Sequence, residues 1–130
     1  MKLSQEDKEL IHQAKALVGR KAVRGGGIKQ VGCVLVTGKG KKFKGVCMDL
    51  SCGIGFCAEH TAIAQMVTVT DETCIKVIVA VDDKSVIPPC GRCRELLNLL
   101  DKRNFLTDVI LSNSHKVKLR DLLPSAYEPS

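Results

Sequence analysis

Aromatic residues are scarce in this chain of 130 residues, which contains no tryptophan, one tyrosine and three phenylalanines. Proteins that bind single-stranded nucleic acid stack successive bases on aromatic side chains, and this sequence has too few for such a platform. Its longest apolar runs, such as residues 77–81, are far shorter than the roughly 18 residues that a membrane span requires. The N-terminal residues also lack the apolar segment of a secretion signal. We therefore expect a cytoplasmic protein with no membrane partner.

Acidic residues are absent between Glu9 and Asp49, whereas nine lysines and arginines fall in that interval. The whole chain carries a net charge of +6. A basic segment such as residues 15–44 can attract nucleic acid. Charge runs without a further motif are nevertheless more often solvated turns and helix ends. The second interpretation is favoured, so we do not expect a nucleic-acid partner.

The remaining composition is typical of one folded domain, with 45% hydrophobic and 26% charged residues. Hydrophobic periodicity predicts helices over residues 5–18, 58–69, 91–101 and 119–123, and strands over residues 31–36, 43–49, 75–81 and 107–112. The three glycines at 25–27 are predicted to form a flexible connection. This order predicts a single α/β domain over residues 1–130, with a mixed sheet and helices on both of its faces.

Seven cysteines require an explanation. In a reducing compartment, clustered cysteines usually bind metal or react, whereas isolated ones pack as small apolar side chains. Cys33 and Cys74 lie in apolar strand patterns and are predicted to be buried. Cys47 and Cys52 lie in or beside the loop before the first cysteine motif, and their role stays open.

Two short motifs contain the other three cysteines: Cys57-Ala58-Glu59 and Pro89-Cys90-Gly91-Arg92-Cys93. Each begins a predicted helix, where free backbone N–H groups and the positive end of the helix dipole stabilise a thiolate. Three thiolates leave the fourth tetrahedral position of a zinc ion open, which distinguishes a catalytic zinc from a structural one. Glu59 lies on the first turn of its helix, close enough to accept a proton from a water that the metal acidifies. We predict Glu59 as the catalytic residue and one zinc ion per subunit, bound by Cys57, Cys90 and Cys93.

Other interpretations of these motifs stay open. The three cysteines can be buried core residues, or a structural zinc site completed by Cys47 or Cys52. A zinc-stabilised module that binds nucleic acid through residues 15–44 would be a binding protein with strongly salt-dependent affinity. Residues 90–93 can instead form a redox dithiol in a metal-free protein. The structural alternatives give Glu59 no role.

The segments Cys57–Ile63 and Pro89–Arg94 resemble the cytidine deaminase family, in its small zinc-dependent form and especially its blasticidin S deaminase branch. The similarity extends from Val31-Gly32-Cys33 to Leu122–Tyr127 and so covers most of the chain. It implies a three-layer α/β/α fold, a catalytic zinc ion and hydrolytic loss of ammonia from a cytosine ring. It also implies a homotetramer, with a homodimer as the alternative.

The resemblance assigns roles to further residues. Glu59 would carry protons to ring nitrogen N3 and then to the departing amine. The backbone N–H of Ala58 would hold the ring carbonyl oxygen, and the carbonyl of Pro88 would face the amine. Tyr127 would close the site of a neighbouring subunit. Near the metal, His60 stands where the family often has arginine, and Arg92 or Arg94 would offset the negative charge of zinc with three thiolates.

The departures from the family fall where a sugar would bind. Cys47 and Asp49 stand where the family usually carries Asn and Glu, and Lys29 and Gln30 precede Val31-Gly32 where an aromatic residue is usual. Asp49 can still accept a hydrogen bond from a hydroxyl, whereas Cys47 is a poor substitute for an amide. Because a buried group that binds a substrate hydroxyl discriminates strongly, these changes predict altered specificity. The expected substrate is a small cytosine-containing nucleoside or analogue, with cytidine, deoxycytidine and blasticidin S as candidates.

Overall fold

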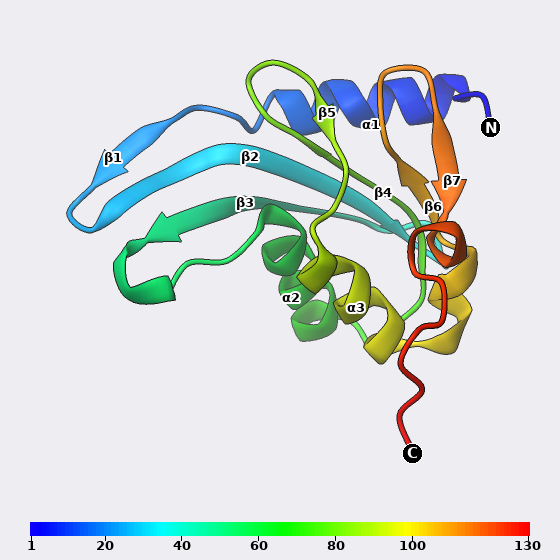
Figure 1. Ribbon diagram of the computed structural model, residues 1–130. Coiled ribbons are helices and arrows are strands. Elements are labelled where there is room, and N and C mark those ends of the chain that lie inside the picture. Colours follow the sequence, from blue (N-terminus) through cyan, green and yellow to red (C-terminus); the bar gives the residue numbers. More distant parts are fainter.

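A mixed β-sheet forms the middle layer of the molecule, and helices lie on both of its faces (Figure 1). The computed structural model describes residues 1–130. The α-helices are α1 (Gln5–Lys15), α2 (Ala58–Val69) and α3 (Gly91–Leu100), and the short 3-10 helices are η1 (Ser51–Gly53), η2 (Lys102–Leu106) and η3 (Leu119–Leu122). The strands are β1 (Lys21–Val23), β2 (Gly26–Thr37), β3 (Lys42–Leu50), β4 (Ile75–Val81), β5 (Val86–Ile87), β6 (Asp108–Ile110) and β7 (Lys116–Lys118). The predicted fold class, an α/β fold with a mixed sheet, is confirmed.

The long strand β2 organises the sheet. It pairs antiparallel with β3 along most of its length, while on its other edge β1 pairs with its first residues and β4 with its last. Only β4 and β6 pair in parallel, and β7 closes that end of the sheet. As a result, β1 and the adjoining parts of β2 and β3 extend beyond the other strands as an arm (Figure 1).

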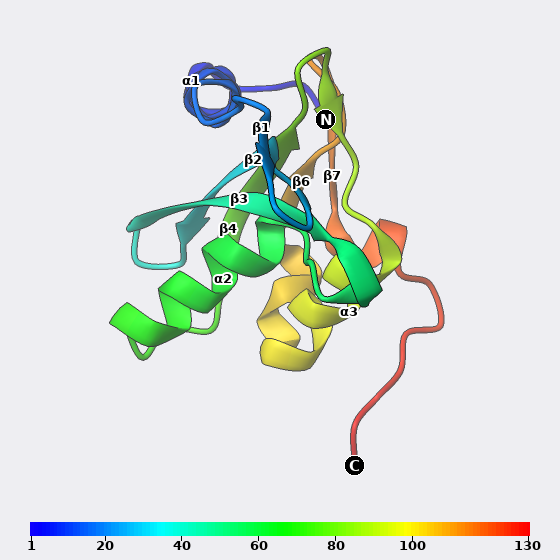
Figure 2. The same ribbon diagram turned by 90° about the vertical axis from the view of Figure 1, so that its left-hand side faces the viewer.

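Side chains alternate between the two faces of the central strands, because successive residues of a strand point to opposite sides. Figure 2 shows α1 alone on one side of the sheet and α2 with α3 on the other. The core beneath α1 contains Leu10, Ala14, Val34, Val77, Val79, Val81, Val86 and Ile110. The core beneath α2 and α3 is larger and includes Cys33, Leu35, Ala62, Met66, Ile78, Ala80, Leu97 and Leu119.

Several predicted boundaries need correction. Helix α1 ends at Lys15, not at residue 18, although Leu17 and Val18 still pack against the core beneath it. This continued packing explains why the apolar spacing extends beyond the helix. The predicted helix at 119–123 is a 3-10 helix that follows the unpredicted strand β7.

The three glycines are not a flexible connection, because they form the β1–β2 hairpin and the start of β2. Gly26 pairs with both Val23 and Leu50. A methyl group on Gly26 would lie 2.0 Å from the carbonyl oxygen of Asp49. Glycine is therefore required here for the close approach of two strands.

Candidate active site

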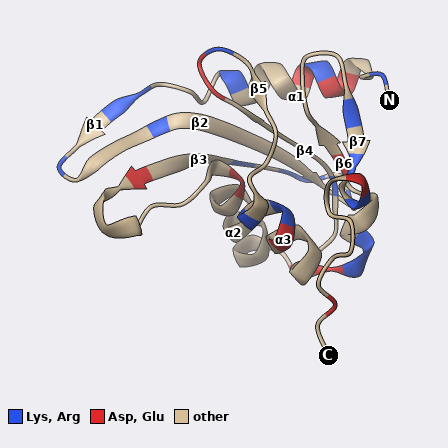
Figure 3. Cartoon of the chain, in the orientation of Figure 1, with Lys and Arg blue, Asp and Glu red and all other residues tan.

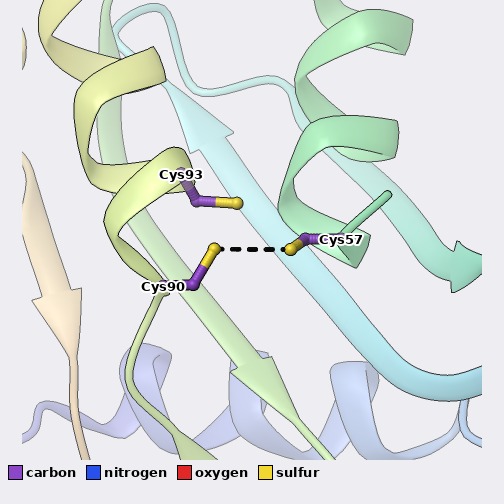
Figure 4. Close-up of side chains that lie close together, drawn as sticks. All are labelled: Cys57, Cys90 and Cys93. Carbon is purple, nitrogen blue, oxygen red and sulfur yellow. Dashed lines mark hydrogen bonds between the residues drawn. The ribbon is translucent and has the colours of Figure 1, made fainter. Parts of the chain in front are cut away.

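The first turns of α2 and α3 meet at one point and bring three cysteines together (Figure 4). Cys57 and Cys90 are the N-cap residues of the two helices, and Cys93 lies in the first turn of α3. Their sulfur atoms all lie within 4.8 Å of one another, and the Sγ atoms of Cys57 and Cys90 are 3.4 Å apart. Two motifs separated by more than 30 residues in the chain thus form one cluster, as the sequence predicts.

The three thiols hold their protons unequally. Burial raises the pKa of Cys93, and the nearby carboxyl of Glu59 raises it further. Burial also raises the pKa of Cys57. For Cys90 the effect of burial is outweighed by hydrogen bonds from the backbone of Cys93 and from the other thiols, so its pKa is lowered. Three crowded thiolates are therefore unfavourable unless a cation neutralises them.

The donor set fits zinc. Three soft sulfur donors, two of them capping helix N-termini, are typical zinc ligands and unsuited to Mg²⁺ or Ca²⁺. All seven cysteines are free, and the cluster has a third member that a redox dithiol does not need. Neither Cys47 nor Cys52 belongs to the cluster, so the structure does not support a fourth cysteine ligand. Three ligands leave one position for water or substrate.

Glu59 is the second residue of α2 and is 4% exposed. Despite this burial, it lines the same cavity as Cys57 and Cys90. Burial raises the pKa of its carboxyl group. A raised pKa makes a carboxyl group a better proton acceptor, as a group that both accepts and returns a proton must be.

The cavity beside the cluster has a volume of about 450 Å³, within the range of small-molecule sites. Most of the predicted site residues line it: Cys47, Asp49, Cys57, Ala58, Glu59, Pro88, Cys90 and Arg92. Cys93 lies behind this surface and is 1% exposed. The structure thus places the predicted zinc, proton-transfer and substrate groups around one hollow.

Besides Cys93, three predicted residues do not line the cavity. The Tyr127 side chain is 61% exposed, and its carbonyl oxygen accepts a hydrogen bond from Asn98. Arg94 donates to the carbonyl oxygens of Pro89 at 2.9 Å and Leu122 at 3.2 Å, so it ties η3 to the start of α3. His60 lies outside as well, with its Nδ1 3.4 Å from Nη2 of Arg92. Of the two arginines, Arg92 is the one on the cavity wall.

Part of the cavity wall could not be predicted from the motifs in the sequence. Gly55 and Phe56 line the cavity because their loop returns to β3, where Phe56 and Met48 exchange backbone hydrogen bonds. A methyl group on Gly55 would lie 2.1 Å from the carbonyl oxygen of Met48. The glycines just before Cys57 were the available signal for this close approach. Gln30 also lines the cavity, although the sequence singled it out only as a departure from the family.

The fates of the other cysteines and of the basic segment differ. Cys33 is fully buried as predicted, whereas Cys74 is only partly buried because it precedes β4 instead of lying within it. The lysines and arginines of residues 15–44 are spread from the end of α1 over the arm to the β2–β3 turn and the start of β3 (Figure 3). Arg20 forms an exposed ion pair with Asp83 at 3.3 Å. No helix has the length and apolarity that a membrane crossing needs.

Comparison with known proteins agrees with this geometry. Residues 4–107 match the family described as the cytidine and deoxycytidylate deaminase zinc-binding region. A cytidine deaminase of Halalkalibacterium halodurans is 30% identical over 103 residues, which is 75% of this chain and 76% of that protein. The cytidine deaminase of Burkholderia pseudomallei has a crystal structure similar to this one, with a TM-score of 0.74 and 27% identity over 96% of this chain and 100% of that chain.

The crystal structure of cytidine deaminase from Mycobacterium tuberculosis is also similar, with a TM-score of 0.71 and 24% identity over 94% of each chain. At this identity the likeness supports the fold alone. The family match covers most of the chain and includes the Cys57 and Cys90–Cys93 motifs. The chain therefore belongs to the cytidine and deoxycytidylate deaminase zinc-binding family and is a zinc-dependent deaminase.

Proposed function

We propose that the chain hydrolytically deaminates a small cytosine-containing nucleoside or nucleoside analogue and releases ammonia. The observation that carries this proposal is the single cavity that joins the thiol cluster to the buried carboxyl group of Glu59. A binding module without catalysis would have no use for a buried carboxyl group at that place.

A zinc ion held by Cys57, Cys90 and Cys93 would supply a Lewis acid that lowers the pKa of a water molecule. Glu59 accepts a proton from the water that attacks ring carbon C4 and delivers it to ring nitrogen N3. Glu59 then moves the second proton of that water to the exocyclic amine, which leaves as ammonia while C4 becomes a carbonyl. Burial of Glu59 supports both transfers, because its raised pKa brings proton uptake and release closer to balance.

Backbone groups orient the ring in this proposal. The N–H of Ala58 opens α2 and has no partner within the helix, so it can donate to the ring carbonyl oxygen. The carbonyl of Pro88 lies on the same cavity wall and can accept a hydrogen bond from the amine. Arg92, also on this wall, would offset the negative charge of three thiolates. Arg94 would contribute at longer range, because its hydrogen bonds go to two carbonyl oxygens.

Blasticidin S is the second candidate substrate. It is favoured by the resemblance of the sequence to that branch, and by Cys47 on the wall in place of an amide. Blasticidin S carries positive charge, and Asp49 presents a carboxylate in the cavity that forms no ion pair within the chain. Cytidine and deoxycytidine remain the first candidates because the matched relative is a cytidine deaminase.

We further propose that copies of the chain assemble in the cytoplasm as a homotetramer, or as a homodimer. Tyr127 is exposed and lies near the end of a C-terminal segment that leads away from the sheet (Figure 2). In this proposed assembly, Tyr127 would close the cavity of a neighbouring copy. Light scattering on the purified protein measures the assembly, and Tyr127→Ala should reduce activity only if a neighbour uses this residue.

The decisive experiment measures ammonia release from cytidine, deoxycytidine, cytosine, guanine and blasticidin S. Glu59→Ala should keep one zinc ion per chain and lose at least about 100-fold in rate, because proton transfer through Glu59 is removed. Glu6→Ala, an exposed change on α1 across the sheet, serves as the matched control and should keep full activity. Full activity in Glu59→Ala would refute the mechanism. Failure of the native chain to act on any cytosine compound would refute the function.

A further inference from the structure

The pairing of β2 with β3 is interrupted beside the cavity. Ile28 pairs with Met48, but the next pair along β2 is Gly32 with Val46, so residues 29–31 stand opposite a single residue of β3. Lys29 has a φ of 65°, a left-handed conformation that non-glycine residues seldom adopt. Extra residues of this kind re-aim a side chain and are frequent next to active sites. The residue that follows Lys29 is Gln30, which lines the cavity.

The amide of Gln30 is held in one orientation. The single residue opposite the bulge is Cys47, whose thiol donates a hydrogen bond to Oε1 of Gln30 at 3.2 Å. A methyl group on Gly27 would lie 2.3 Å from Nε2 of Gln30, so the amide rests against the bare backbone of that glycine. The oxygen is therefore occupied, while the two N–H groups of Nε2 form no hydrogen bond within the chain.

Asp49 places an acceptor next to this donor. It lies two residues after Cys47 on β3, and therefore on the same face of the strand. It pairs across the strands with Gly27, against which the amide of Gln30 rests. Its carboxylate also has no partner within the chain. An N–H donor and a carboxylate acceptor side by side match a hydroxyl group, which accepts one hydrogen bond and donates another.

The amide of Gln30 and the carboxylate of Asp49 lie at the end of the cavity that is remote from the thiols. Gln30, Asp49 and Leu50 also line an adjoining hollow formed with Gly25–Gly27, and none of the zinc-binding cysteines reaches that hollow. When the reacting carbon of the ring lies beside the cluster, the substituent on ring nitrogen N1 points toward this end.

We infer that Gln30 is a specificity-determining residue that donates a hydrogen bond to a hydroxyl group on the N1 substituent of the substrate, while Asp49 accepts from the same hydroxyl. Cys47 and the bulge at Lys29 are positioning features that turn the amide toward it. This inference rests on the proposed function and narrows the substrate class to nucleosides whose sugar carries a hydroxyl.

The test compares kcat/KM for cytidine with that for 2′,3′-dideoxycytidine and for 5′-deoxycytidine. One hydrogen bond corresponds to about three- to tenfold, so the native chain should prefer cytidine over at least one analogue by that factor. Gln30→Leu should lower this ratio by the contribution of one hydrogen bond, leaving only that of Asp49, while zinc content stays at one per chain. Gln65→Leu makes the same chemical change at an exposed position of α2 and should leave the ratio unaltered.

Two further variants distinguish a changed orientation of the Gln30 amide from a general loss of stability or zinc binding. Cys47→Ala frees the amide and Gly27→Ala displaces it, so both should lower the same ratio with Gln30 still present. Cys47→Ser retains a donor and should restore most of the ratio. A merely structural role for Cys47 would change stability or zinc content without changing the ratio.

The outcomes distinguish this inference from the proposed function. Deamination of all three compounds with ratios that Gln30→Leu does not change would refute the inference alone. A native chain that shows no preference among the three would refute it as well. If the native chain deaminated blasticidin S but no cytidine compound, the inference would be wrong while deamination stood. Absence of ammonia release from every cytosine compound would refute both.

Discussion

Gly45 of β3 is the point where α2 lies directly on the sheet. A methyl group at this position would lie 2.5 Å from the backbone nitrogen of Ala62 and 2.8 Å from the carbonyl oxygen of Ala58. Ordinary contacts of such a methyl group begin at 3.4 Å. Because both neighbours are helix backbone, no flexible side chain can move aside. In the variant Gly45→Ala, the start of α2 must therefore retreat by roughly 1 Å, since protein interiors have little free space.

The retreat has two consequences. Overpacking of this severity costs about 2–3 kcal/mol in the free energy of unfolding, which for a chain of this length lowers Tm by about 8–12 °C. It also moves Cys57 relative to Cys90 and Cys93, and a metal site tolerates displacements of only about 0.5 Å. Zinc affinity should therefore fall at least about tenfold, by analogy with the loss of residues that orient metal ligands.

Thermal unfolding with excess zinc gives the first quantity, and competition with a chelating dye gives the second. Gly19→Ala is the matched control, because nothing lies within 4 Å of a methyl group there. If Gly45→Ala melted at the same temperature as Gly19→Ala and bound zinc equally well, close packing of α2 on β3 would not be what aligns the cluster.

Three further predictions concern the metal and the buried polar groups. Removal of zinc with a chelator should lower Tm and increase the reactivity of Cys57, Cys90 and Cys93 toward a thiol reagent; unchanged thiol reactivity would mean that they do not bind the metal. Asn104 is fully buried, accepts a hydrogen bond from the Ile75 N–H at 2.7 Å and donates to the carbonyl oxygens of Leu97 and Thr73. Asn104→Ala should therefore lower the free energy of unfolding, measured with urea, by about 3 kcal/mol. A decrease below about 1 kcal/mol would contradict this. Burial alone would raise the pKa of Asp7, but hydrogen bonds from Lys116 and Ser4 lower it. A lowered pKa in the folded state means that this stabilisation is complete above the unfolded-state pKa of about 4 and disappears as pH falls through the folded-state pKa. Asp7→Asn should therefore cost about 2–3 kcal/mol at pH 7 and progressively less below about pH 4, and a cost independent of pH would contradict the ion pair with Lys116.

The fold could be predicted where a segment carries its own pattern. The predicted bounds of α2 and β4 agree with the structure, because both segments have a long apolar pattern ended by local signals. Strands β1, β5 and β7 have only two or three residues each, too few to show a period. They exist because a longer strand pairs with them. The hairpin at Gly26 likewise depends on contact with Asp49, which is distant in the chain.

The residues of the candidate site divide in the same way. The placement of Cys57, Glu59, Cys90 and Cys93 at two helix starts could be predicted, because it follows from local backbone structure. Arg94 could not be assigned from its neighbours in sequence, since its hydrogen bonds depend on where η3 packs.

By itself, the sequence determined where the groups of the candidate site lie: two helix starts that each provide thiols, and a carboxyl group within the same first turn as one of them. That information is local, because spacing along a helix sets it. Only the tertiary structure decided what shares the cavity with these groups. Gln30 reaches it through a bulge in β2 and a hydrogen bond to Cys47, 17 residues away in the chain. Such contacts arise from the pairing and packing of distant segments, so no local pattern records them.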